Sequence, residues 1–105
     1  MKESQYQSKI IKKLEEMFPG CIVIKTDANY RQGFPDLVIL WNQYWASLEV
    51  KTEPSYTAEP NQDYYIDKLN SESFAAYIYP ESEGEVLNAL QQAFKSPRRT
   101  RVSKS

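Results

Sequence analysis

The amino-acid sequence predicts an α/β fold of the α+β kind, with a mixed central sheet flanked by helices and the element order α-β-β-β-α-β-α. Three observations lead to this prediction: amphipathic helical segments lie at both ends, short apolar runs of strand length lie between them, and the chain has 105 residues. A chain of this length builds one hydrophobic core. Helical and strand segments in this mixed order pack as helices on a mixed sheet.

The first elements follow from the spacing of apolar residues. They recur at helical spacing over residues 4–18, which predicts an amphipathic helix. Pro19 and Gly20 end this helix. The β-branched run that follows predicts a strand over residues 21–26, and a polar loop leads from there to Pro35.

Two apolar runs in the middle of the chain predict an antiparallel hairpin. Residues 36–41 are nearly all apolar, which predicts a central strand buried on both faces. Residues 44–51 predict a third strand, and only Asn42-Gln43 separates the two. A tight loop there pairs Trp41 with Tyr44 and fixes every pairing below them, although Asn-Gln is not a favoured two-residue turn and a bulge would shift the register.

The rest of the domain alternates loop, helix and strand. Residues 52–60 contain two prolines and read as a loop. Helical character follows over residues 61–70, an apolar and aromatic strand over 74–79, and a final amphipathic helix over 81–94.

The end of the chain differs from the domain in composition. We expect residues 1–94 to form the domain and residues 95–105 to form a flexible tail with almost nothing to bury. The tail carries five basic residues and no acidic one, although the whole chain has a net charge of −1. Its arginines, Arg98, Arg99 and Arg101, suit contacts with DNA phosphates. The alternative is a solubilising end that binds nothing in particular.

The absence of histidine and the single cysteine narrow the possible chemistry. Histidine is the commonest metal ligand and general base, and Cys21 has no partner in the chain for a disulfide. Zinc sites of the Cys/His type, Ser-His-Asp hydrolysis and histidine-based nucleases are therefore excluded. Carboxylates, lysine and tyrosine remain, so a bound metal would be a hard ion held by oxygen.

The predicted hairpin brings two carboxylates together. Its register places Asp36 opposite Glu49, and opposed like charges on one sheet face are destabilising unless a cation neutralises them. The strand period of two puts Lys51 on the face of Glu49 and leaves the Val50 carbonyl as a further oxygen ligand. Two carboxylates, a carbonyl and waters suit Mg²⁺ or Mn²⁺.

A lysine beside this carboxylate pair suits phosphodiester hydrolysis. The Lys51 ammonium can orient or help deprotonate a water and offset charge at phosphorus, while a metal polarises the phosphoryl oxygen. Each residue also has a structural alternative. Glu49 and Lys51 could form the solvated face of an edge strand, and Asp36 could cap a turn after Pro35.

These residues resemble the motif of the PD-(D/E)XK nucleases, in which a Pro-Asp leads one strand and Asp/Glu-x-Lys lies on the next. Pro35-Asp36 and Glu49-Val50-Lys51 match it. The likeness covers residues 3 to about 90 and looks closest to the small stand-alone VRR-NUC group, similar in style to phage and archaeal Holliday junction resolvases. Its blocks are Glu3-Ser4-Gln5-Tyr6-Gln7, Gly33-Phe34-Pro35-Asp36-Leu37, and Pro60-Asn61-Gln62 with Leu69 and the strand to Tyr79.

The resemblance implies a restriction-endonuclease-like core, Mg²⁺ dependence with Mn²⁺ as a substitute, and two further site residues. Glu3 would add a carboxylate from the first helix, against the alternative of a helix-terminal Glu favoured by the macrodipole. Gln62 would help place the lysine or the scissile strand, against the alternative of a solvated helix residue. The chain departs from the related Gln-x-x-x-Tyr pattern, since position 66 is Ile66, which argues against the helicase-nuclease branch.

Two surface features suggest partners. Basic, amide and aromatic side chains in or before the loop leading to Asp36 could grip a DNA backbone, unless they belong to a solvated loop without a partner. They are Lys25, Asn29, Tyr30, Arg31 and Gln32. An aromatic hairpin tip, with Trp41, Tyr44 and Trp45, is either covered by a helix or forms a protein contact. We expect a homodimer, because a two-fold axis would pair two active sites on a symmetric substrate.

The leading hypothesis is a Mg²⁺-dependent endonuclease selective for branched DNA, with Asp36, Glu49 and Lys51 as its core. The alternatives are a sequence-specific endonuclease of the restriction or homing kind, and a noncatalytic DNA-binding or partner-binding module. Opposed carboxylates facing a phosphate argue against the last. No organic cofactor is expected. The polar start and the lack of a long apolar stretch predict a cytoplasmic protein without membrane contact, in the host cytoplasm if a phage encodes it.

Overall fold

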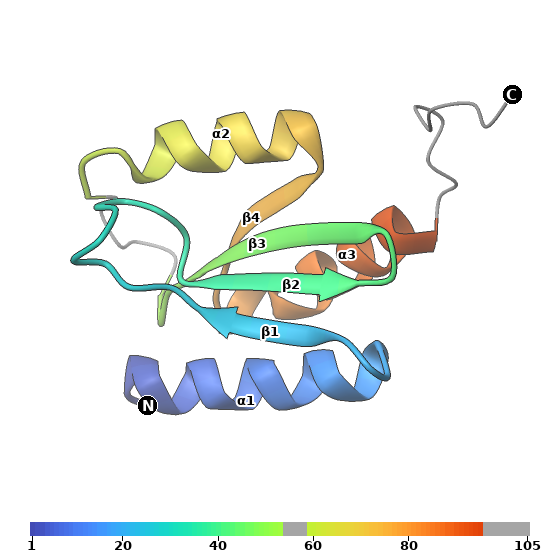
Figure 1. Cartoon of the computed structure of the whole chain (residues 1–105). Coiled ribbons are helices and arrows are strands. Elements are labelled where there is room, and N and C mark those ends of the chain that lie inside the picture. Colours follow the sequence, from blue (N-terminus) through green and yellow to red (C-terminus); the bar gives the residue numbers. More distant parts are fainter. Residues whose placement is uncertain (54–58, 96–105) are drawn as a thin grey trace, which may run out of the picture.

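A computed structural model of the chain describes residues 1–53 and 59–95. It confirms the α+β class, with a four-stranded mixed sheet and helices on both of its faces (Figure 1). The predicted basic tail begins at residue 95, but Lys95 is the last residue of the final helix, and the rest of the tail, with Arg98, Arg99 and Arg101, lies outside the described residues. Within them, no helix is long and apolar enough to cross a membrane.

The predicted order of elements is confirmed, with one short addition before the last helix. The elements are α1 (Glu3–Met17), β1 (Ile22–Lys25), β2 (Leu37–Trp41), β3 (Tyr44–Val50), α2 (Gln62–Glu72), β4 (Phe74–Ile78), a 3₁₀ turn η1 (Pro80–Ser82) and α3 (Glu83–Lys95). Pro80 explains the added turn, because a proline is tolerated only in the first turn of a helix.

The sheet has the strand order β1-β2-β3-β4, in which β4 runs parallel to β3 and the other pairs are antiparallel. The predicted hairpin register is confirmed, because Trp41 pairs with Tyr44 and Leu37 with Leu48. Asn42 adopts a left-handed φ of 57° in the connecting loop, a conformation that asparagine tolerates better than most residues. The Asn-Gln loop therefore closes without a bulge.

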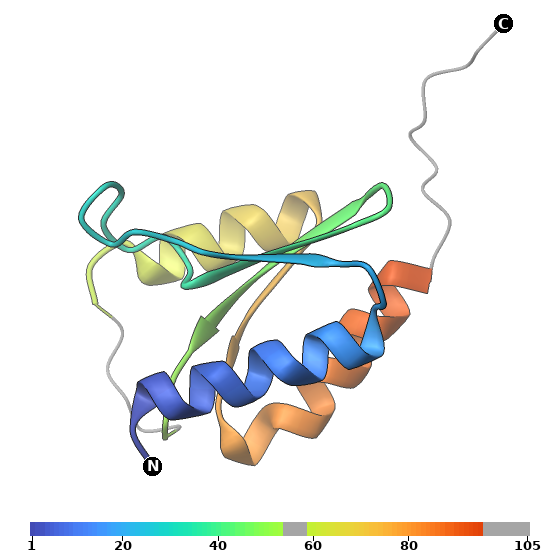
Figure 2. The ribbon, with the colours of Figure 1, turned by 60° about the horizontal axis from the view of Figure 1, so that its bottom comes forward.

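The main core lies between the sheet and the pair α1 and α3, which cover the same face (Figure 2). Tyr6, Ile10 and Leu14 supply the buried stripe of α1, one helical turn apart. Alternate residues of β2 and β3, such as Ile39 and Leu48, complete this core because strand side chains alternate between faces.

The opposite face of the sheet is only half covered. Helix α2 packs over β3 and β4 (Figure 1), where the Tyr77 hydroxyl donates a hydrogen bond to Asp63. Over β1 and β2 none of the described helices covers this face, and Ile22, Ile24 and Leu40 are 59%, 44% and 39% exposed. The prediction that residues 36–41 are buried on both faces is therefore wrong, because a continuous apolar run does not reveal whether a helix covers its second side.

The aromatic hairpin tip belongs largely to the core. The Trp41 ring packs against Phe18 and Phe94, and its Nε1 donates a 3.0 Å hydrogen bond to the Pro19 carbonyl. Tyr44 stacks on Phe94 as well, with the ring centroids 5.6 Å apart. Of the two predicted alternatives, cover by a neighbouring helix is the one that these two residues adopt.

Candidate metal and phosphate site

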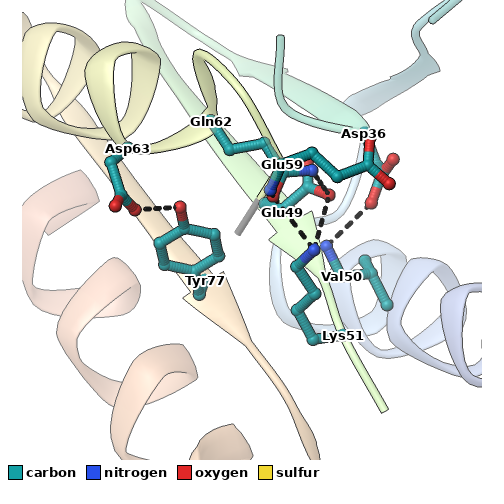
Figure 3. Close-up of polar contacts among 8 residues, drawn as sticks. All are labelled: Asp36, Glu49, Val50, Lys51, Glu59, Gln62, Asp63 and Tyr77. Carbon is teal, nitrogen blue, oxygen red and sulfur yellow. Dashed lines mark hydrogen bonds and ion pairs between the residues drawn. The ribbon is translucent and has the colours of Figure 1, made fainter. Parts of the chain in front are cut away.

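The site begins where the hairpin ends, at the foot of β2 and β3. Asp36 directly precedes β2, and its Oδ2 accepts a 2.9 Å hydrogen bond from the backbone N–H of Val50 (Figure 3). Thr26 fixes the other side of this turn, because its N–H donates to the Asp36 carbonyl at 2.9 Å and its hydroxyl to the Pro35 carbonyl at 2.7 Å. The confirmed register brings Asp36 to the level of Glu49, as predicted.

Helix α1 adds a third carboxylate from its first residue. Glu3, Asp36 and Glu49 each offer an oxygen, and these three oxygens lie within 4.8 Å of one another. The start of the helix is held from both sides. The Lys2 N–H donates to Gln5 Oε1 at 3.3 Å, and the Tyr6 hydroxyl donates to Glu83 on α3 at 3.0 Å. The packing of α1 against the core thus carries Glu3 to the foot of the hairpin.

Lys51 follows Glu49 by one strand period and is buried beside it. Its Nζ lies 3.8 Å from Glu49 Oε2 and donates a 3.0 Å hydrogen bond to Gln62 Oε1. The Lys51 backbone N–H donates to the Ile78 carbonyl at 2.9 Å, so the parallel partner strand β4 holds this residue in line beyond the end of β3.

Gln62 connects the lysine to the carboxylates. It is the first residue of α2 and is buried, and its Nε2 donates to Glu49 Oε2 at 3.0 Å while its Oε1 accepts from Lys51 (Figure 3). The same oxygen accepts a 2.9 Å hydrogen bond from the Glu59 N–H. An uncharged amide can serve a cation and an anion at once, because it carries both a donor and an acceptor.

Burial is the main cause that raises the pKa of each of the three carboxyl groups. Burial, and then the charge of Asp36, raises the pKa of Glu49 to about 8. Burial also raises the pKa of Asp36, against the opposing hydrogen bond from Val50, and it raises that of Glu3, with Asp36 as the next cause. Glu49 is only 4% exposed, and its Oε1 accepts no hydrogen bond from the residues that the structure describes. A buried acceptor left unpaired is costly.

This donor set fits a hard divalent cation. Three carboxylate oxygens at this spacing offer the ligand type that Mg²⁺ and Mn²⁺ prefer. Val50 enters the site through its backbone N–H to Asp36. Its carbonyl as a metal ligand stays a prediction.

The cluster opens into a hollow of about 200 Å³. Its lining includes the predicted Gln32 and four residues that were not predicted as site residues, Ala28, Gly33, Phe34 and Glu59. Gly33 has a left-handed φ of 86°, and a Cβ there would lie 2.7 Å from both the Pro60 carbonyl oxygen and the Asn61 Cβ. The loop before Asp36 therefore packs directly on the start of α2, which only glycine allows.

The predicted DNA-contact residues divide into two groups. Lys25, Tyr30 and Arg31 line a second, larger hollow beside the site, whereas Gln32 lines the carboxylate hollow itself. Asn29 is exposed and lines neither hollow as described; its N–H donates to Asp27 Oδ1 at 2.8 Å, which shapes the loop. Contact of these residues with DNA stays a prediction.

Comparison of the chain with protein-family models, curated proteins and solved structures finds no match. The carboxylate, lysine and amide geometry is therefore the main basis for a functional conclusion.

Proposed function

We propose that this protein is a metal-dependent endonuclease that hydrolyses phosphodiester bonds in DNA. The observation that carries the proposal is the network at the foot of the hairpin, in which Glu3, Asp36 and Glu49 offer three oxygens within 4.8 Å and Lys51 lies 3.8 Å from Glu49. A noncatalytic binding module would gain nothing from clustered carboxylates facing a phosphate. The resemblance of Pro35-Asp36 and Glu49-Val50-Lys51 to the PD-(D/E)XK motif supports the same conclusion.

The carboxylates and the lysine have separate roles in this proposal, the carboxylates at the metal and the lysine at the phosphate. Glu3, Asp36 and Glu49 would hold Mg²⁺, which when bound supplies a Lewis acid for the phosphoryl oxygen and an acidified water. The Lys51 ammonium, held by Gln62, is placed to orient the attacking water and to offset the negative charge that develops at phosphorus. Gln62 is a positioning residue, because it fixes Lys51 relative to Glu49.

The proposal extends to the fold type and the substrate. The observed order of elements, with an antiparallel hairpin followed by a parallel β4, supports a restriction-endonuclease-like core. Branched DNA is the preferred substrate in this proposal, because the described residues form one small domain around the site without a separate base-reading element. A sequence-specific endonuclease is the second candidate, and the exposed loop residues Tyr30 and Arg31 are the elements that favour it.

A homodimer belongs to the proposal as a means of cutting two strands of a symmetric junction. Sedimentation velocity of the purified chain, alone and with a four-way junction, tests it. A monomer in both samples would remove the dimer from the proposal and leave the hydrolytic site untouched.

The deciding experiment incubates the purified chain with an end-labelled four-way junction, a linear duplex and a single strand, each with Mg²⁺, Mn²⁺ or EDTA. We expect metal-dependent cutting of the junction that Lys51→Ala abolishes. Lys68→Ala is the matched control, because Lys68 is an exposed lysine paired with Glu72 on α2, away from the site. Equal cutting of linear duplex at one sequence would favour the sequence-specific candidate, and binding without any cutting would overturn the enzyme.

A further inference from the structure

A second hollow of about 470 Å³ lies beside the carboxylate site. Its lining combines three apolar or aromatic residues, Ile24, Tyr30 and Phe34, with four polar or charged ones, Lys25, Thr26, Asp27 and Arg31. The two hollows share Phe34 as a common wall. A volume of this size falls in the range of pockets that take small organic groups.

The position of this hollow relative to the carboxylates is set by the sheet. Ile24 pairs with Val38 across β1 and β2, and two residues further along the same pair of strands the Thr26 N–H donates to the Asp36 carbonyl. Two residues of strand span about 7 Å. Ile24, at one end of the hollow, therefore lies about two strand residues from the level of Asp36. The hollow is on the part of the sheet that α2 leaves uncovered.

Two residues of the lining, Phe34 and Arg31, are held by Tyr65 on α2. The Phe34 ring packs edge-on against Tyr65, with the ring centroids 5.3 Å apart, and the Arg31 Nη1 donates a 3.0 Å hydrogen bond to the Tyr65 hydroxyl. Tyr30, in contrast, is 85% exposed. An apolar hollow with one free aromatic ring at its edge suits a flat ring stacked on that tyrosine.

The charged residues of this hollow indicate which chemical group accompanies the flat ring. Lys25 and Arg31 are the cations of its lining, and they suit a phosphate that follows the ring. Asp27 and Thr26 offer a hydrogen-bond acceptor and a hydroxyl for the polar edge of the ring. A flat ring with polar edges, linked to phosphates on both sides, is a nucleobase in a strand.

We propose that this hollow binds one unpaired nucleobase of the DNA strand whose neighbouring phosphate lies at the carboxylate site. The inference rests on the proposed function for the identity of that phosphate. A base inside a duplex is stacked on both faces and cannot enter, so the hollow selects DNA with an unpaired nucleotide next to the cleavage position. This gives a physical basis for preferring junctions, bulges and flaps over continuous duplex.

The test measures binding separately from cleavage. The probe is a DNA duplex that carries 2-aminopurine as a single-nucleotide bulge, with the same duplex carrying paired 2-aminopurine as its reference, and the protein is Lys51→Ala in EDTA. We expect quenching of the bulged base and about tenfold tighter binding of the bulged duplex. Tyr30→Ala should abolish both effects, and Tyr30→Phe should keep them. Ile22→Ala is the control, because Ile22 is an exposed isoleucine on β1 outside the lining.

The outcomes separate this inference from the proposed function. Equal binding of bulged and paired duplex, or bulge binding that Tyr30→Ala leaves unchanged, would overturn the base-binding hollow even if the wild-type chain cuts DNA. If quenching depends on Tyr30 but the wild-type chain cuts no DNA with Mg²⁺ or Mn²⁺, the base-binding hollow would be supported and the proposed nuclease activity would be overturned. Because Tyr30 is exposed, its replacement does not disturb the core.

Discussion

The Gln62 amide donates a 3.0 Å hydrogen bond to Glu49 Oε2 and accepts one of the same length from Lys51 Nζ. The uncharged Gln62 side chain thus separates the buried carboxyl group of Glu49 from the buried amino group of Lys51. Without it, the ammonium and the carboxylate could close from 3.8 Å into a direct ion pair, which would remove the lysine from the phosphate and a ligand oxygen from the metal.

Replacing Gln62 tests this spacing role. We expect Gln62→Met, which keeps the volume and removes both polar groups, to reduce kcat by about 10- to 100-fold with little change in KM for DNA. It should also cost about 1–3 kcal/mol of unfolding free energy, because it leaves buried partners unpaired. Initial rates and urea unfolding measure the two effects. Asn88→Ala, at an exposed position on α3, is the control, and an unchanged kcat would remove Gln62 from the machinery.

A pair of glycines tests how the loop before Asp36 is held. Gly33 and Gly20 have nearly the same left-handed φ, 86° and 87°, but a Cβ meets close contacts only at Gly33. We expect Gly20→Ala to cost about 1 kcal/mol from backbone strain alone. Gly33→Ala should cost clearly more and should also reduce cleavage, because Asp36 follows on the same loop. Urea unfolding of both variants gives the difference, and equal costs would mean that the loop moves aside freely.

The hairpin half of the site was predictable from sequence because it is local. A two-residue connection and the alternation of β3 leave one register for Asp36 and Glu49, and that register is observed. Lys51 follows from the same strand period. No contact with a distant segment is needed to predict these three positions.

The other half depends on contacts between distant segments, which periodicity does not encode. Glu3 and Gln62 were indicated only by the resemblance, and Glu59 by no signal at all, because each reaches the site through the packing of a helix or of the loop before α2. Gly33 was visible as part of a motif. Its contact with Pro60, however, follows only from the way α2 sits on the sheet.

The raised pKa of Glu49 predicts how stability depends on pH in EDTA. Its folded value is about 8 and its ordinary value is 4.5. Between the two, the folded chain binds more protons than the unfolded chain, so unfolding free energy falls as pH rises from about 5 to about 8. Thermal melts at pH 5.5 and 8 should give the lower Tm at pH 8, by about 4–8 °C for each kcal/mol lost. Glu49→Gln should flatten this dependence, and a wild-type Tm that rises over this range would contradict the burial of the carboxylate pair.

The negative charges gathered at Glu3, Asp36 and Glu49 predict a specific response to divalent cations. Ca²⁺ or Mg²⁺ should raise Tm at pH 8 more than at pH 5.5, because a larger fraction of the Glu49 carboxyl group is ionised at pH 8. Ligand binding to the folded state stabilises it, and protons compete for the same oxygens. Na⁺ at equal ionic strength is the control for simple screening. Equal shifts from Na⁺ and Mg²⁺ would argue against a metal site at Glu3, Asp36 and Glu49.

Replacing Glu3 tests whether helix α1 contributes a ligand to the metal site. We expect Glu3→Gln to weaken Mn²⁺ binding by about tenfold or more and to reduce cleavage in proportion at limiting metal, with partial recovery at high Mn²⁺. Glu16→Gln is the matched control, because Glu16 is an exposed glutamate on the same helix. Isothermal titration with Mn²⁺ and cleavage rates across a metal series measure both effects.

The two substitutions also differ in their effect on the helix, which keeps the result interpretable. Glu3 lies in the first turn of α1, where a negative charge contributes about 0.3–1 kcal/mol to stability, whereas Glu16 lies in the last turn, where it opposes the dipole. Burial and the charge of Asp36 oppose this contribution, because they raise the pKa of Glu3. The change in Tm of Glu3→Gln without metal therefore measures the balance of these effects, and the Mn²⁺ affinity measures metal binding separately. If Mn²⁺ affinity stayed at the wild-type level, Glu3 would not be a metal ligand, and the metal would depend on Asp36 and Glu49.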